Sequence, residues 1–249
     1  MSLVFCDIDT IFGKKQILRK ASLTAKDGLL TGIVGPNGSG KSTLIKTLFA
    51  LAPITGGQIL LDDVSTAHIS RRQLARKVGY VGQEMACAFD FTVREVVAMG
   101  RFPHRSADRS RRTDDVVDES LAALHMQQFA ERSIKTLSGG EKKMVFLARA
   151  VAQEVDVIVL DEPTNHLDIC HQLFIMDYLK GSGKTILVVL HDLNLAARYC
   201  DELCLMCDGS VIANGSASEV LTEGNVKRVF GVNGKISRQE SGRLAFKLL

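Results

Sequence analysis

Short apolar runs alternate along the chain with longer stretches that have helical spacing. Residues 29–34, 157–160 and 185–190 are runs of this kind and predict buried strands. Residues 42–49 follow the first run and carry apolar side chains at the spacing of a helix. Buried runs that alternate with helical stretches favour a mainly parallel sheet covered on both faces. The pattern therefore predicts an α/β fold.

Three stretches depart from this pattern. Residues 7–10 and 16–24 resemble short paired strands and predict an N-terminal antiparallel β region. Between about residues 84 and 155 the strand-like runs vanish and helical spacing dominates, so we expect a helical subdomain (approximately 84–155) inserted into the α/β core. A last strand is predicted at residues 244–248, and the whole chain, residues 1–249, is expected to form a single domain.

Several helix starts are marked by a Ser or Thr that is followed three residues later by Glu or Gln. In such a capping box the two side chains satisfy backbone N–H groups at the start of the helix. The four pairs are Ser70 with Gln73, Thr92 with Glu95, Ser138 with Glu141, and Ser216 with Glu219.

Composition narrows the class of protein. The 249 residues are 46% hydrophobic and 24% charged, which is ordinary for a globular protein and excludes intrinsic disorder. The net charge of +3 gives no argument for nucleic acid. The sequence has no apolar run of membrane-spanning length and no leader pattern at Met1, so we expect a cytosolic protein whose six cysteines are reduced thiols.

The strongest chemical motif is the segment 35–42, which fits G-x-x-x-x-G-K-[ST] and stands between a predicted strand and a predicted helix. Glycines let backbone N–H groups converge on phosphate oxygens, and the helix N-terminus adds a positive dipole end. Lys41 is expected to reach the β- and γ-phosphates of ATP, and Ser42 to ligate Mg²⁺. The nucleotide-binding residues predicted here are Gly35, Asn37, Gly38, Ser39, Gly40, Lys41, Ser42 and Thr43.

Two further segments carry candidate chemistry. Asp161 and Glu162 end a predicted central strand, where ligands bind in open α/β sheets; Asp161 would hold Mg²⁺ and Glu162 would polarise the attacking water. A polar turn at a strand end is the alternative. Ser138 and Gly140 begin a predicted helix with few side chains, which predicts a second anion site. A helix that merely begins with glycines is the alternative. A second such site suggests that nucleotide is clamped from two sides.

In this order, the motifs resemble those of the nucleotide-binding subunit of ABC transporters, and the resemblance covers essentially the whole chain. The three segments correspond to the Walker A loop, the Walker B strand and the signature sequence. The resemblance implies that Gln83 is the Q-loop glutamine, which senses Mg²⁺ and the γ-phosphate, that 165–168 is the D-loop and that His191 is the switch histidine. Phe12 stands where the family stacks an aromatic ring on adenine; a packed strand residue is the alternative.

The resemblance also implies an assembly. Two copies would sandwich two ATP molecules head to tail, so that Ser138 and Gly140 act from the partner copy. The subunit would lie peripherally on the cytoplasmic side of the cell membrane, with transmembrane permease subunits and, indirectly, an external substrate-binding protein as partners. Phe89 and Phe91, beyond Gln83, are apolar loop residues for which we expect a permease contact, with packing on the protein's own helices as the alternative.

Residues 92–104, together with 218–222 and 229–232 in the C-terminal part of the chain, resemble the ATPases that drive import of iron–siderophore, haem and cobalamin. The alternatives are an importer of metal ions or another small solute, and a soluble ABC ATPase acting on nucleic acid or ribosomes. The sequence departs from the group at Glu141, where glutamine is commoner, at Gly82, where proline is common, and at 142–144, Lys-Lys-Met in place of Arg-Gln-Arg.

Two other signals are given less weight. Cys200, Cys204 and Cys207 have the spacing of an iron–sulfur site, but a strand through 203–207 would point the last two cysteines to opposite faces. Five arginines within residues 101–112 are interpreted as a solvated loop rather than as a nucleic-acid site.

Overall fold

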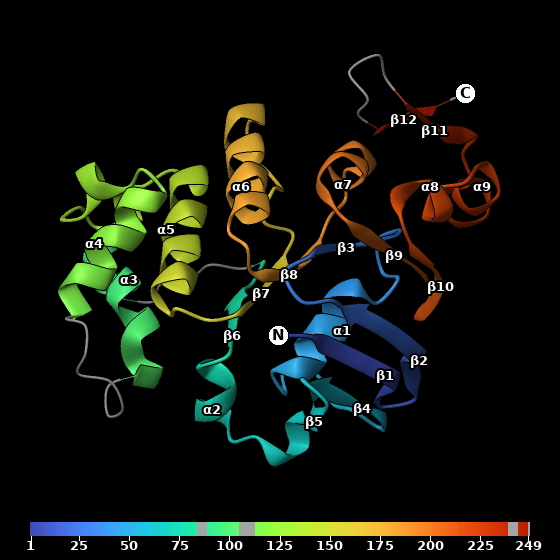
Figure 1. Ribbon diagram of the computed structural model, residues 1–249, viewed down its shortest axis with the longest axis horizontal. Helices are drawn as coiled ribbons and strands as arrows, with labels where there is room; N and C mark the ends of the chain where they lie inside the picture. Colours follow the sequence, from blue (N-terminus) through green and yellow to red (C-terminus); the bar gives the residue numbers. More distant parts are fainter. Residues whose placement is uncertain (84–88, 105–112, 239–243, 249) are drawn as a thin grey trace. The chain divides into compact units, whose positions relative to one another are not determined.

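The computed structural model describes residues 1–83, 89–104, 113–238 and 244–248 (Figure 1). Its contacts divide the chain into two compact units, the first made of Met1–Ile69 with Met176–Leu249 and the second of Ser70–Ile175. Within the described ranges, no helix is both long and apolar enough to cross a membrane. The predicted limits of the helical subdomain, 84–155, differ from those of the second unit and stay a prediction.

The first unit holds most of the strands. Its elements are β1 (Leu3–Phe12), β2 (Lys15–Ala25), β3 (Leu30–Val34), α1 (Lys41–Leu48), β4 (Gly56–Leu61), β5 (Val64–Ser65), the 3-10 turn η1 (Thr66–His68), β8 (Thr185–Val189), α7 (Leu193–Tyr199), β9 (Glu202–Cys207), β10 (Ser210–Gly215), α8 (Ala217–Val220), α9 (Glu223–Phe230), β11 (Gly234–Arg238) and β12 (Leu244–Leu248).

The second unit is mainly helical. Its elements are α2 (Arg71–Ala75), β6 (Val78–Val81), α3 (Val93–Ala98), η2 (Met99–His104), α4 (Thr113–Ala123), η3 (Gln127–Phe129), η4 (Ile134–Thr136), α5 (Gly139–Ala152) and β7 (Val157–Asp161). Helix α6 (Ile169–Gly181) begins in this unit and ends in the first.

The N-terminal strands form an antiparallel sheet in the order β2-β1-β4-β5, which confirms the predicted β region. Strand β1 is longer than predicted and begins at Leu3, where buried and exposed positions already alternate. Leu3, Phe5 and Ile8 point into the core and are almost fully buried.

Parallel pairing provides the frame for the site. In the first unit β3 pairs in parallel with both β8 and β9, and in the second unit β6 pairs in parallel with β7. Every residue of β3, β7 and β8 is buried. Strands buried on both faces read as continuous apolar runs, which is why these three were recognisable in the sequence. The predicted α/β class with a parallel-rich sheet is confirmed.

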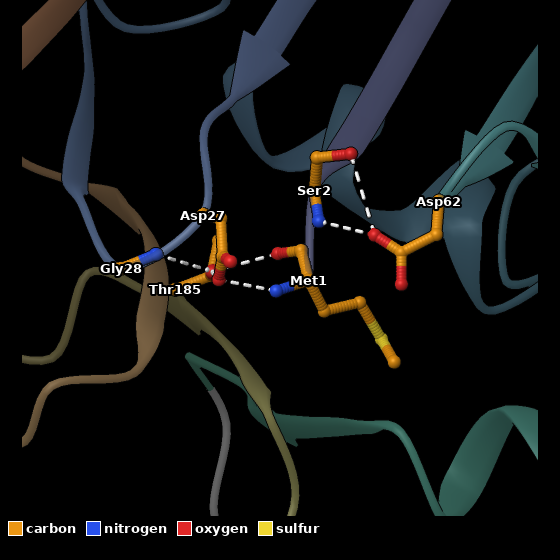
Figure 2. A network of polar contacts seen from close by, with 6 residues as sticks. All are labelled: Met1, Ser2, Asp27, Gly28, Asp62 and Thr185. Carbon is orange, nitrogen blue, oxygen red and sulfur yellow. Dashed lines mark hydrogen bonds and ion pairs between the residues drawn. The ribbon is translucent and has the colours of Figure 1, made fainter.

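A polar network fixes the beginning of β8 (Figure 2). The hydroxyl of Thr185 donates to the carbonyl oxygen of Met1 at 2.7 Å and accepts from the backbone N–H of Gly28 at 3.0 Å. The amino group of Met1 forms an ion pair with Asp27, and this hydrogen-bonded charge lowers the pKa of the Asp27 carboxyl. The network joins the first residue of β8 to the turn that leads into β3.

The helices of the second unit bury one shared core. Helices α3, α4 and α5 lie side by side (Figure 1) and bury the apolar faces that their spacing predicts. All four predicted capping boxes are present, with the Ser or Thr hydroxyl accepting from the third residue's N–H and that residue's side chain accepting from the cap. The predicted helix starts are therefore confirmed.

Candidate active site

The segment 35–40 joins the end of β3 to the start of α1 in the first unit. Gly35 has φ 151°, and a Cβ there would lie 2.2 Å from the carbonyl oxygen of Met206, so the close approach of two backbones requires glycine. Gly38 has φ 79°, but a Cβ there would meet nothing within 4 Å. The loop is therefore packed on one side and open on the other.

A buried cation lies inside this loop. Lys41 is only 4% exposed, and its Nζ donates to the carbonyl oxygens of Gly35 and Pro36, each at 2.8 Å. The hydroxyl of Ser39 is buried and has no hydrogen-bond partner within the described part of the chain. A buried ammonium and an unused hydroxyl, set in a glycine loop at a helix N-terminus, fit an anionic ligand such as a phosphate tail.

His191 follows β8, the parallel neighbour of β3. Leu190 donates its N–H to the carbonyl oxygen of Ile33 at 3.0 Å, which sets the carboxyl ends of these two strands side by side in the first unit. Asp192 caps α7 by accepting from the N–H groups of Asn194 and Leu195 at 2.7 and 3.1 Å. The histidine and the start of the glycine loop therefore stand at adjacent strand ends.

Phe12 ends β1 and is 48% exposed. The residue is thus only half-covered by the sheet, and an aromatic ring offers a face for stacking on a planar ligand.

The second set of predicted residues gathers at the end of β7 in the second unit. Asp161 is fully buried, and Glu162 follows it with φ 55°, in the left-handed region. One carboxylate oxygen of Glu162, Oε2, accepts from Nε2 of Gln83 at 2.8 Å and from Nδ2 of Asn165 at 2.6 Å. Two amides thus aim this carboxylate. The structure brings the side chains of Gln83, Glu162 and Asn165 together.

The negative charge of Asp161 affects the pKa of a tyrosine on the neighbouring strand. Burial, and secondarily the Asp161 carboxylate, raise the pKa of Tyr80 on β6 to about 12. A buried acid at a strand end, with an oxygen-bearing amide at Gln83 in the same unit, is the hard-oxygen chemistry that Mg²⁺ prefers.

The signature segment forms the start of α5. Ser138 is its N-cap, and the Glu141 carboxylate accepts from both the backbone N–H and the hydroxyl of Ser138 at 2.7 Å. These hydrogen bonds lower the pKa of Glu141, so it carries a full charge at neutral pH. At Gly140 a Cβ would come within 3.4 Å of Leu167. Glutamate therefore preserves the cap but adds a negative charge beside the predicted anion site.

Sequence reasoning assigned no role to Lys143. Its Nζ donates to the backbone carbonyl oxygens of Asn165 and, at 3.5 Å, of Glu162. The one signal of this in the sequence is the departure at 142–144, where a lysine replaces the commoner glutamine.

The interpretation of the arginine cluster is wrong for one member. Arg101 is 4% exposed, donates to the carbonyl oxygen of Ala152 at 2.9 Å and pairs with Glu154 at 2.5 Å, so it is an internal bridge rather than a solvated side chain. The other four arginines lie within 105–112, outside the described residues.

Burial raises the pKa of the Cys204 thiol to about 12 and also raises the pKa of the Cys200 thiol.

Comparison with known proteins agrees with these features. The family model described as "ABC transporter" matches residues 18–165. The cobalamin import ATP-binding protein BtuD of Halobacterium salinarum is 38% identical over 234 residues, which are 92% of this chain but only 59% of that protein. The ferric enterobactin transport ATP-binding protein FepC of Escherichia coli is 36% identical over 89% of this chain and 84% of its own length.

Among solved structures, a dimeric bacterial ABC transporter cassette superposes with a TM-score of 0.77 at 29% sequence identity, covering 86% of this chain and 98% of that one. The glycine loop around Lys41, the acidic end of β7 and the capped start of α5 carry the motifs through which the sequence resembles this family. The chain therefore belongs to the ABC transporter family and has the P-loop ATPase fold of its cassettes.

Proposed function

We propose that the chain is the ATP-hydrolysing subunit of an importer and powers uptake of an iron–siderophore, cobalamin or haem through a membrane permease. The observation that carries hydrolysis is the Glu162 carboxylate, held by the amides of Gln83 and Asn165 at the end of a buried strand. The relatives named for cobalamin import and ferric enterobactin transport support the class of cargo. An importer of metal ions or another small solute is the nearest alternative.

The residues divide the work by chemistry. The backbone of 35–40 and the ammonium of Lys41 would bind the phosphate tail of ATP, and Phe12 would stack on adenine. Glu162 would accept the proton of the attacking water, and His191 would contact the γ-phosphate. Ser42, Gln83 and Asp161 would hold Mg²⁺, which supplies charge neutralisation at the phosphates when bound.

A second copy of the chain would complete each site. Ser138 and Gly140 stand at the capped start of helix α5, and a helix N-terminus suits the phosphate of an ATP held by the partner. A solved cassette that is 29% identical to this chain is dimeric, which supports an assembly of two copies. The dimer would lie on the cytoplasmic side of the membrane against its permease, with an external substrate-binding protein delivering the cargo.

The test is Glu162→Gln. The amide keeps the size of the side chain and its hydrogen bonding but cannot take the proton, so turnover should fall by about 10²-fold or more while ATP still binds. Single-turnover hydrolysis and nucleotide binding are measured on the same protein. The control is Glu131→Gln on the exposed Arg94–Glu131 pair, which should hydrolyse ATP like the parent. Near-normal turnover of Glu162→Gln would remove Glu162 from this role.

A further inference from the structure

The catalytic carboxylate proposed above stands on a backbone that needs outside support. Glu162 has φ 55° and His166 has φ 58°, and both are residues with a Cβ. A left-handed backbone costs such a residue about 1–2 kcal/mol, so the surroundings must stabilise it. The turn is closed internally by the N–H of Asn165, which donates to the carbonyl oxygen of Glu162 at 3.3 Å.

Lys143 supplies a second hold on the same turn. It lies in the second turn of α5, and its ammonium donates to the carbonyl oxygens at both ends of the turn, those of Glu162 and Asn165. Charge-assisted hydrogen bonds are stronger than neutral ones, and an ammonium can serve two carbonyls at once. Helix α5 is thereby joined to the backbone beneath the Glu162 carboxylate.

The turn 162–165 positions the Glu162 carboxylate. The side-chain amide of Asn165 donates to Oε2 of Glu162 at 2.6 Å, while its carbonyl oxygen receives the Lys143 ammonium. If Asn165 shifted, the carboxylate would lose one of its two amide donors. Lys143 thus affects the position of the Glu162 carboxylate in two ways, through the backbone of Glu162 and through the side chain of Asn165.

The environment of Lys143 is consistent with a fixed and specific role. Burial lowers the pKa of its ammonium, and the Glu162 carboxylate acts in the opposite direction. Burying part of a charged side chain is unfavourable unless its donors find partners. The two carbonyl oxygens provide them.

We propose that Lys143 is a positioning residue for ATP hydrolysis, which fixes the turn 162–165 and so aims the Glu162 carboxylate at the attacking water. The inference rests on the proposed function because it assumes that Glu162 is the catalytic base. Lys143 acts on that base through the backbone and Asn165. Its replacement should therefore affect the chemical step and not the binding of ATP.

The experiment compares three variants of the full chain. Lys143→Met removes the donors while keeping the length and volume of the stem, and Lys143→Arg keeps a cation with several N–H groups. Lys142→Met removes the same groups from the neighbouring position, where the structure gives no side-chain bond to the turn and no site role is assigned. ATP affinity, single-turnover hydrolysis and the thermal midpoint are measured for each.

We expect Lys143→Met to hydrolyse about tenfold to hundredfold more slowly with KM for ATP within about twofold of the parent, because small displacements of a catalytic group have effects of this size. Lys143→Arg should recover most of the rate, and Lys142→Met should behave like the parent. In a Glu162→Gln background, Lys143→Met should cause no further loss, since its action passes through that carboxylate. Lys143→Ala, which also lacks the donors and favours the helix, serves as a second variant should the methionine protein fail to fold.

Two results would overturn the inference. Parent-like turnover in Lys143→Met or in Lys143→Ala would show that the turn holds its position without the ammonium. A rate loss that arginine does not rescue, and that tracks the thermal midpoint, would reduce Lys143 to a residue of general stability. Both differ from failure of the proposed function, in which Glu162→Gln itself would remain active.

Discussion

Adding one methyl group to the open side of the glycine loop 35–40 distinguishes its role in folding from its role in binding ATP. Gly38 has φ 79° and open space where a Cβ would stand, so Gly38→Ala meets no protein atom but must hold alanine in a left-handed backbone. That conformation costs about 1–2 kcal/mol of folding stability. Gly183, in the turn before β8, is a matched control because it has φ 66° and equally open space. Both variants should lose the same stability.

Only Gly38→Ala should also lose nucleotide binding. If the open side of the loop holds the phosphate tail, the added methyl group clashes with it at a cost of about 1–3 kcal/mol, which is about fivefold to 150-fold in affinity. Denaturant unfolding without ligand and titration with ATP measure the two effects separately. The reasoning fails if Gly38→Ala binds ATP like Gly183→Ala, because the open face of the loop would then not be the phosphate face.

Two further perturbations test the proposed partners. Glu141→Gln should preserve the cap on Ser138 but remove one negative charge from the start of α5. Because this relieves about 1 kcal/mol of repulsion between the carboxylate and the ATP phosphates, ATP-dependent dimers should form at about fivefold lower protein concentration, as measured by light scattering. An unchanged or weaker dimer would contradict the sandwich. Phe89→Glu changes a residue that is 70% exposed and whose ring centroid lies 6.0 Å from that of Phe91, edge to face. Assembly with a permease in reconstituted membranes should weaken while the affinity for ATP is unchanged. The control Val64→Glu, at an exposed position of β5, should assemble normally, and equal assembly of both variants would place the permease contact elsewhere.

The elements that the sequence predicted well are those whose signal is local. The strands β3, β7 and β8 are continuous apolar runs because both of their faces are buried, so no partner had to be known to identify them. The capping boxes are also local, since each needs only two side chains three residues apart. The N-terminal sheet was predicted too short because its strands are half-exposed and bend at register shifts, which interrupts the alternation.

The same distinction applies to the candidate site. Gly35, Lys41 and Ser138 are recognisable because a glycine loop and a helix cap are built from neighbouring residues. The role of Arg101 was misjudged because its partners, Ala152 and Glu154, lie some fifty residues further along the chain. Nothing in a run of arginines tells which of them will fold inward.

Lys143 is the clearest case of a role that needs the folded chain. Its helix position is visible in the sequence, but its target is a pair of carbonyl oxygens, and backbone atoms leave no residue-type signal. The departure from glutamine at this position marks a chemical difference without saying what the ammonium meets. In the structure it meets the turn whose left-handed backbone supports Glu162. We therefore interpret the lysine at position 143 as a change in how this chain supports its candidate catalytic carboxylate. The hydrolysis rates of the Lys143 variants measure that support directly.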